Sequence, residues 1–246
     1  MSFSYNAVWE DTLKLLRQHA PLLAAIAGVF LFLPNLLFAV LMPPPVPRGG
    51  DPQQALQALL DFYQAATPWL MLISLFTMVG TLAMLRLVFE RDTVGGALVQ
   101  GLVLTPFYFM LSLGWGLMIG FGLILILVPG LYLFGRLAPF PAVLVAENRR
   151  NPVDTFNRTF ALTKGHGWAI FGIIFVVWIV ALIAMGVANA LFGLIFVLAA
   201  GQELGRTLTA VVSSALMAGL TSLLMMLYAA IYRALAGTTS IAATFE

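Results

Sequence analysis

VPGLYLFGRLAPFPAVLVAENRRNPVDTFNRTFALTKGHGW, the stretch from Val128 to Trp168, decides the fold of this chain. It begins with Pro129-Gly130, a pair that breaks helices, and carries Arg136 inside an apolar segment. A basic loop at Arg149-Arg150 follows, and Asn151-Pro152 then opens an amphipathic segment that runs directly into another apolar stretch. This order of features predicts the cytoplasmic hinge between two helices of a polytopic membrane protein.

The composition of the whole chain supports that interpretation. Of 246 residues, 61% are hydrophobic and 9% are charged, whereas about 25% of a soluble domain is charged. Apolar runs of about 20 residues cross a bilayer as helices, and such runs leave no room for a soluble catalytic domain. We therefore expect an all-α, single integral membrane domain over residues 1–246, with six spans at about 22–42, 68–89, 98–127, 130–147, 168–199 and 208–233.

Short amphipathic helices are expected at the membrane surface. Residues 5–18 predict one in the headgroup region, because apolar and charged side chains fall on different faces. A second is expected after an Asp51 cap, flat on the far surface. The third covers 152–164, with Asn151 as its cap, Val153, Phe156 and Phe160 on its apolar side, and its end at Gly165.

Breaks within the spans are also predicted. Pro34-Asn35 should kink the first span. The third span is longer than one straight crossing, so it tilts, kinks near Pro106, begins in the interface, or contains a turn near residues 112–116. Gly116 and Gly120 form a GxxxG pair that favours close approach of another helix.

Loop charges predict the orientation. With six spans, one side of the membrane carries nine basic residues, namely Lys14, Arg17, Arg86, Arg91, Arg149, Arg150, Arg158, Lys164 and Arg233. The other side carries Arg48 and Arg206. Because basic residues concentrate in cytoplasmic loops, both termini are expected in the cytoplasm.

Several kinds of chemistry are disfavoured. The chain has no cysteine, which excludes disulfides and thiolate sites, and its two histidines and scattered acids match no metal-ligand spacing. A net charge of +2 is too small to indicate nucleic-acid binding. We expect no cofactor, no metal and no enzymatic activity.

Part of the central stretch resembles a known family. VPGLYLFGR, then a proline-led segment ending at Glu147, then FALTKGHGW, is similar to the membrane domain attached to some bacterial glycerophosphodiester phosphodiesterases and to stand-alone inner-membrane proteins of the YciC type. The resemblance covers about 128–168 and implies six membrane helices in a bacterial cytoplasmic membrane. The phosphodiesterase activity of that family belongs to a separate soluble barrel, which this sequence lacks, so the resemblance does not imply the activity here.

Arg136 is the sharpest candidate for a binding site, together with Tyr132 and Glu147. A charge within a span is costly unless it is paired or hydrated, and a guanidinium matches a phosphate group bidentately. Alternatively, Arg136 extends toward the interface or caps free carbonyls near a helix break. Pro129 and Gly130 form either a hinge for alternating access or a simple turn.

The basic residues of the two surface segments suggest a lipid-binding surface, formed by Lys14, Arg17, Arg149, Arg150, Arg158 and Lys164. Each basic residue near an anionic membrane contributes about 1 kcal/mol, although the same residues could serve orientation alone. We expect a non-enzymatic, lipid-contacting membrane protein that is accessory to envelope lipid handling, with membrane lipids, a membrane protein or a second copy as partners. The alternative is a small transporter or flippase for an anionic amphiphile.

Overall fold

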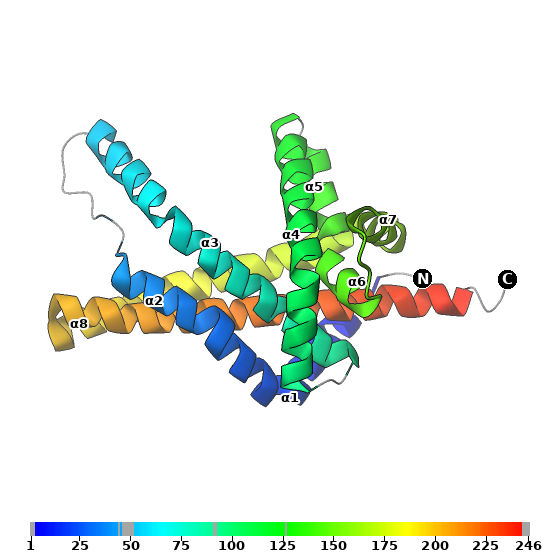
Figure 1. Ribbon diagram of the computed structural model, residues 1–246, viewed down its shortest axis with the longest axis horizontal. Coiled ribbons are helices and arrows are strands. Elements are labelled where there is room, and N and C mark those ends of the chain that lie inside the picture. Colours follow the sequence, from blue (N-terminus) through cyan, green and yellow to red (C-terminus); the bar gives the residue numbers. More distant parts are fainter. Residues whose placement is uncertain (1–2, 44, 46–51, 91–92, 126, 243–246) are drawn as a thin grey trace.

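The computed structural model describes residues 3–43, 45, 52–90, 93–125 and 127–242. Within these ranges all regular structure is helical, which confirms the predicted all-α fold (Figure 1). The elements are α1 (Tyr5–Ala27), the π-helix η1 (Gly28–Phe32), α2 (Leu33–Leu41), α3 (Pro52–Glu90), α4 (Val94–Leu125), α5 (Leu127–Leu137), α6 (Phe140–Ala146), α7 (Pro152–Leu162) and α8 (Gly167–Ala242).

Five helical segments are long and apolar enough to cross a membrane, and the last of them folds back on itself. It runs from Gly167 to Gly237 and has 71 residues. Gly201 interrupts it with φ 78° and ψ 176°, a conformation that is essentially restricted to glycine. The two arms of α8 lie side by side, so the described residues form six apolar segments (Figure 1). The predicted polar link from Gly201 to Arg206 is therefore a single-residue turn followed by helix.

The first span is continuous with the predicted surface helix. Residues Tyr5–Leu41 form one helical segment of 37 residues, about 55 Å long. The predicted separate helix over 5–18 was wrong in this respect. Pro34 lacks a backbone N–H, and the turn before it is the π-helix η1, in which the Leu33 N–H bonds to the Gly28 carbonyl.

The second span is likewise longer than predicted. α3 continues through Pro68 as one helix of 39 residues, so residues 52–67 do not form a separate helix flat on the surface. Its predicted cap, Asp51, lies outside the described residues. A change from polar to apolar side chains does not itself end a helix, and both helices continue although Pro21 and Pro68 each remove one backbone hydrogen bond.

The third and fourth spans form a hairpin that stands steeply against the arms of α8 (Figure 1). α4 ends before Pro129 and Gly130. These two residues lie in the first turn of α5 rather than at a break. A Cβ on Gly130 would lie 2.8 Å from the Gly122 carbonyl carbon, so the two backbones touch there. Gly116 and Gly120 meet no described atom within 4 Å, so the predicted GxxxG contact is wrong within this chain.

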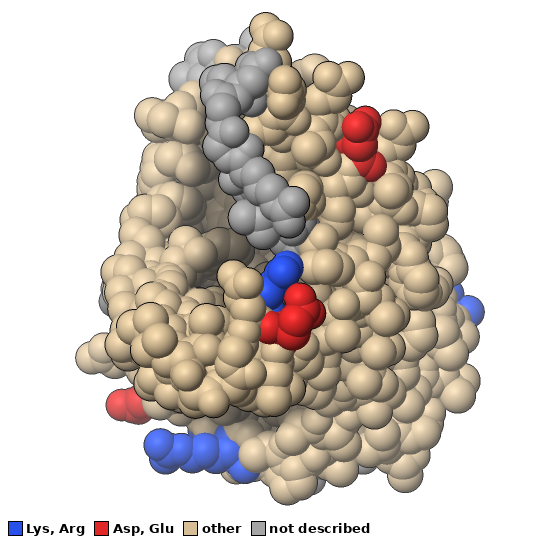
Figure 2. Space-filling model, turned by 90° about the vertical axis from the view of Figure 1, so that its left-hand side faces the viewer, with Lys and Arg blue, Asp and Glu red and all other residues tan. Residues whose placement is uncertain are grey.

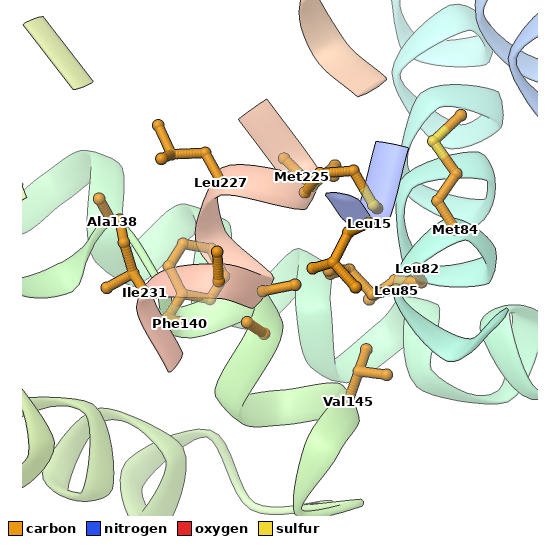
Figure 3. Packing of buried hydrophobic residues seen from close by; sticks show 14 of the residues in the cluster. Leu15, Leu82, Met84, Leu85, Ala138, Phe140, Val145, Met225, Leu227 and Ile231 are labelled. Atoms are coloured by element: carbon orange, nitrogen blue, oxygen red, sulfur yellow. The ribbon is translucent and has the colours of Figure 1, made fainter. Parts of the chain in front are cut away.

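The predicted span 130–147 is two helices. α5 ends at Leu137 and α6 begins at Phe140, with Pro139 as its N-cap. Every residue from Phe140 to Val145 is buried. Figure 3 shows Phe140 of α6 packed near Ile231 of α8, with Leu15 of α1 and Leu82 and Leu85 of α3 nearby. α6 thus forms the centre of the core.

Candidate functional site

Glu147 lies at the centre of a charged cluster. It is the C-cap of α6, and its two carboxylate oxygens accept hydrogen bonds from Arg149 and Arg158. The distances are 2.6 Å from Arg149 Nε to Oε2 and 2.8 Å from Arg158 Nε to Oε1. The Tyr232 hydroxyl donates to Oε1 over 3.3 Å. One carboxylate therefore joins α6, the following loop, α7 and the last part of α8.

The environment keeps Glu147 ionised. Burial by itself would raise the pKa of the Glu147 carboxyl, but the hydrogen bonds and positive charges of Arg158 and Arg149 outweigh it and lower the pKa below its usual value. Its side chain is 16% exposed. The cluster of two guanidinium groups and one carboxylate thus carries a net charge of +1.

A third arginine, Arg86, contacts the same turn. Arg86 of α3 is only 1% exposed, forms an ion pair with Glu90, and donates from Nη2 to Asn148 Oδ1 over 2.9 Å. Asn148 has φ 46°, a left-handed conformation that asparagine tolerates better than most residues. Asn148 therefore ends α6 and accepts the bond from Arg86. In the sequence, Arg86 entered only the count of basic residues that predicts the orientation. Its spacing of four residues from Glu90 was the feature that indicates an ion pair.

Arg136 is held by α7. It lies in the last turn of α5, and its Nη2 donates to the backbone carbonyl of Phe160. Its guanidinium carbon lies 4.9 Å from the centre of the Phe160 ring and 5.8 Å from that of Tyr132. Its Nε is 3.5 Å from Thr163 Oγ1. Carbonyls in the last turn of a helix lack intrahelical partners, so Arg136 caps the end of α7.

The predicted ligand-binding residues thus fall into two groups. Arg136 and Tyr132 lie together on α5, and the Tyr132 ring also packs on Trp168 with centroids 5.7 Å apart. Glu147 is held separately by Arg149, Arg158 and Tyr232.

A close helix crossing positions Arg136. A Cβ on Gly135 would overlap the Gly167 carbonyl and lie 2.9 Å from the Phe171 nitrogen. A Cβ on Gly167 would lie 2.7 Å from Cγ of Arg136. Because both residues lack side chains, α5 and α8 touch through their backbones, and the guanidinium is brought to the end of α7.

α7 is capped as predicted and ends earlier than predicted. The Asn151 side chain accepts from the Val153 N–H over 3.0 Å, and the helix ends at Leu162 instead of Gly165. Its buried residues include Thr155 and Thr159, whose hydroxyls donate to the carbonyls four residues earlier. On the predicted apolar side, Val153 is 64% exposed, whereas Phe156 and Phe160 are half-buried.

The predicted basic surface lies on elements that meet at one end of the molecule. Arg233 of α8 pairs with Asp11 of α1 over 3.3 Å, and the rings of Phe3 and His166 are 6.0 Å apart. Two of the six basic residues, Arg149 and Arg158, are half-buried on Glu147. The remaining four are exposed: Lys14, Arg17, Arg150 and Lys164.

The opposite end of the molecule differs in character. Figure 2 shows that this face is mostly uncharged. A cavity of about 590 Å³ there is lined by Glu203 and Arg206 together with small and apolar residues. Nearby, Ser213 donates to Asn189 over 2.5 Å between the arms of α8, a hydrogen bond typical of packed membrane helices.

Among the described residues, no three histidine, aspartate or glutamate side chains come close enough to share a metal ion. Comparisons with protein families, with curated proteins and with solved structures find no match.

Proposed function

We propose that the chain is a non-catalytic, multi-pass protein of the bacterial cytoplasmic membrane that binds anionic phospholipid headgroups at its basic end, as an accessory to envelope lipid handling. The observation that carries the proposal is that four basic residues are exposed on or beside helices that pack together, α1 against α8 and α7 against α8: Lys14, Arg17, Arg150 and Lys164. They come from three separate segments of sequence.

The expected strength follows from their number. Each basic residue near an anionic surface contributes about 1 kcal/mol, so four give about 4 kcal/mol, roughly a thousandfold preference over a neutral surface. Trp9 is 37% exposed and Trp168 is 49% exposed on the same elements. Tryptophan favours the membrane interface, which supports a position of the basic side chains at headgroup level.

The alternative is a small transporter or flippase for an anionic amphiphile with Arg136 in its site. The break between α5 and α6, just after Arg136, favours this function. Against it, the Phe160 carbonyl and the Thr163 hydroxyl already accept hydrogen bonds from the guanidinium. A transported anion would have to displace these contacts.

The test compares lipid preference in proteoliposomes of phosphatidylglycerol and phosphatidylcholine, measured as the fraction of each spin-labelled lipid immobilised by the protein. A variant with Lys14, Arg17, Arg150 and Lys164 all changed to glutamine should lose the preference for phosphatidylglycerol. Arg206→Gln, at the opposite end, is the matched control and should behave as wild type. An unchanged preference in the four-residue variant would refute the proposal, and rapid lipid flipping in the same vesicles would favour the transporter.

A further inference from the structure

A long apolar groove runs along α8 from the basic end. It has a volume of about 630 Å³ and is bordered by the start of α1, the first arm of α8 and Leu223 of the second arm. Ile173 and Val177, which are 9% and 8% exposed, form its floor, and Val176 and Val180, which are 59% and 61% exposed, form its rim.

The length of the groove matches one leaflet. On α8 its lining extends from Gly172 to Ala184, a distance of about 18 Å along a helix. The hydrocarbon of a bilayer is roughly 30 Å thick, or about 15 Å for each leaflet. A groove of this length suits an extended acyl chain and is too short for a helix that crosses the whole membrane.

The two ends of the groove differ in polarity. Tyr5 lies at the end near Gly172, where a Cβ on that glycine would be 3.9 Å from the Tyr5 hydroxyl, and Asn6 and Trp9 of the same helix also line the groove. The rest of the lining is apolar. Tyr5 also contacts Phe3, whose ring lies against His166 next to the exposed Lys164. Polar and basic groups are therefore concentrated where the headgroup of a lipid in this leaflet would lie.

We infer that this groove holds one acyl chain of a bound anionic phospholipid, with the headgroup at Tyr5 and Asn6 beside the basic end. The inference deepens the proposed function and rests on it for the choice of headgroup. It assigns a discrete, stoichiometric lipid site, in contrast to general attraction of the basic surface to anionic lipid.

The first test uses variants that fill the groove. Gly172→Leu and Ala184→Phe place side chains at its two ends, where the local space tolerates them. Native mass spectrometry of the detergent-extracted protein should show one phospholipid on the wild type, with occupancy about tenfold lower in each variant. Gly186→Leu and Ala190→Phe are matched controls on the exposed side of the same arm, outside the groove, and should keep the lipid.

A second measurement does not depend on those variants. A chain that keeps Trp9 and has Trp69, Trp115, Trp168 and Trp178 changed to phenylalanine is delipidated, then mixed with one equivalent of phosphatidylglycerol with brominated acyl chains. Trp9 lines the groove, so its fluorescence should be quenched at this ratio.

The outcomes separate this inference from the proposed function. The inference would be overturned if the wild type carries no bound lipid, or if both groove variants bind as much lipid as the wild type. It would also be overturned if Ala184→Phe converts a dimer to monomers, because a second copy would then occupy the groove. The surface preference of the four-residue variant is measured independently of these results. Equal retention of phosphatidylcholine would overturn the anionic assignment and weaken the proposed function, while leaving an acyl-chain site.

Discussion

Tyr232 donates a hydrogen bond to Oε1 of Glu147 over 3.3 Å, across a sequence separation of 85 residues. This bond joins the last part of α8 to the turn after α6. The same carboxylate holds Arg149 and Arg158, and Asn148 next to it accepts from Arg86. The turn at Glu147-Asn148 is therefore the point at which α3, α6, α7 and α8 are joined by polar contacts.

Glu147→Gln should destabilise the protein by about 1–3 kcal/mol at pH 7, because Arg149 and Arg158 lose their shared counter-charge and the pairs are partly exposed. Thermal unfolding in detergent measures the change. The folded pKa is lowered, so this stabilisation is present above the usual carboxyl pKa of about 4.3 and is lost as the pH falls through the folded value. The stability of Glu147→Gln should therefore fall less than that of the wild type as the pH is lowered. The same pH dependence of stability in both proteins would contradict the role given to Glu147.

Arg86→Met should lower the free energy of unfolding by about 2–4 kcal/mol, since Asn148 and Glu90 both lose the buried guanidinium that they share. Arg86→Lys keeps the charge but not the geometry and should lose less. The measurement is the thermal midpoint, with Arg17→Met as an exposed control. Equal midpoints for Arg86→Met and Arg17→Met would show that the buried contacts contribute nothing.

Arg136→Met should loosen α7, because the Phe160 carbonyl loses its donor and the ring of Phe160 loses its cation. We expect faster amide exchange at 160–163 and a stability loss of about 1–2 kcal/mol. Arg136→Lys should fall between Met and wild type. Loss of bound anionic lipid with unchanged exchange in α7 would instead support a ligand role for Arg136.

Gly135→Ala should be strongly destabilising, by about 1–3 kcal/mol or more, because the new methyl group would meet backbone atoms of α8 that cannot rotate away. Gly116→Ala is the control, since no described atom lies within 4 Å of a Cβ there. Equal thermal midpoints for the two variants would refute the backbone-to-backbone crossing.

The six-span topology with cytoplasmic termini is tested by single cysteines in a chain that has none of its own. Gln202 and Asn151 are both exposed and lie at opposite ends. A cysteine at 202 should react with an impermeant maleimide in intact cells, and one at 151 should react only after permeabilisation. The reverse pattern would invert the orientation.

The local features of the fold could be read from the sequence. The Asn151 cap, the polar link at Gly201 and the apolar runs each depend on a few neighbouring residues, because caps, turns and periodicity are short-range properties. The sequence also shows that basic residues concentrate in alternate loops. The ends of the helices were less predictable: α1 and α3 continue past the polar-to-apolar boundary near residues 18–22 and past Pro68, although Pro21 and Pro68 each remove one backbone hydrogen bond.

Only the tertiary structure decided which charges meet. Arg158 and Tyr232 lie 11 and 85 residues from Glu147 in the sequence, and they reach it because α7 and α8 fold across the end of α6. The burial of Arg86 and the contact of Arg136 with the Phe160 carbonyl depend in the same way on helix crossings. Those crossings are set by close contacts such as Gly135 against Gly167. The sequence alone determined where helices form and which end is basic, because those properties are local or additive, whereas pairing and the acyl-chain groove depend on packing between segments far apart in the chain.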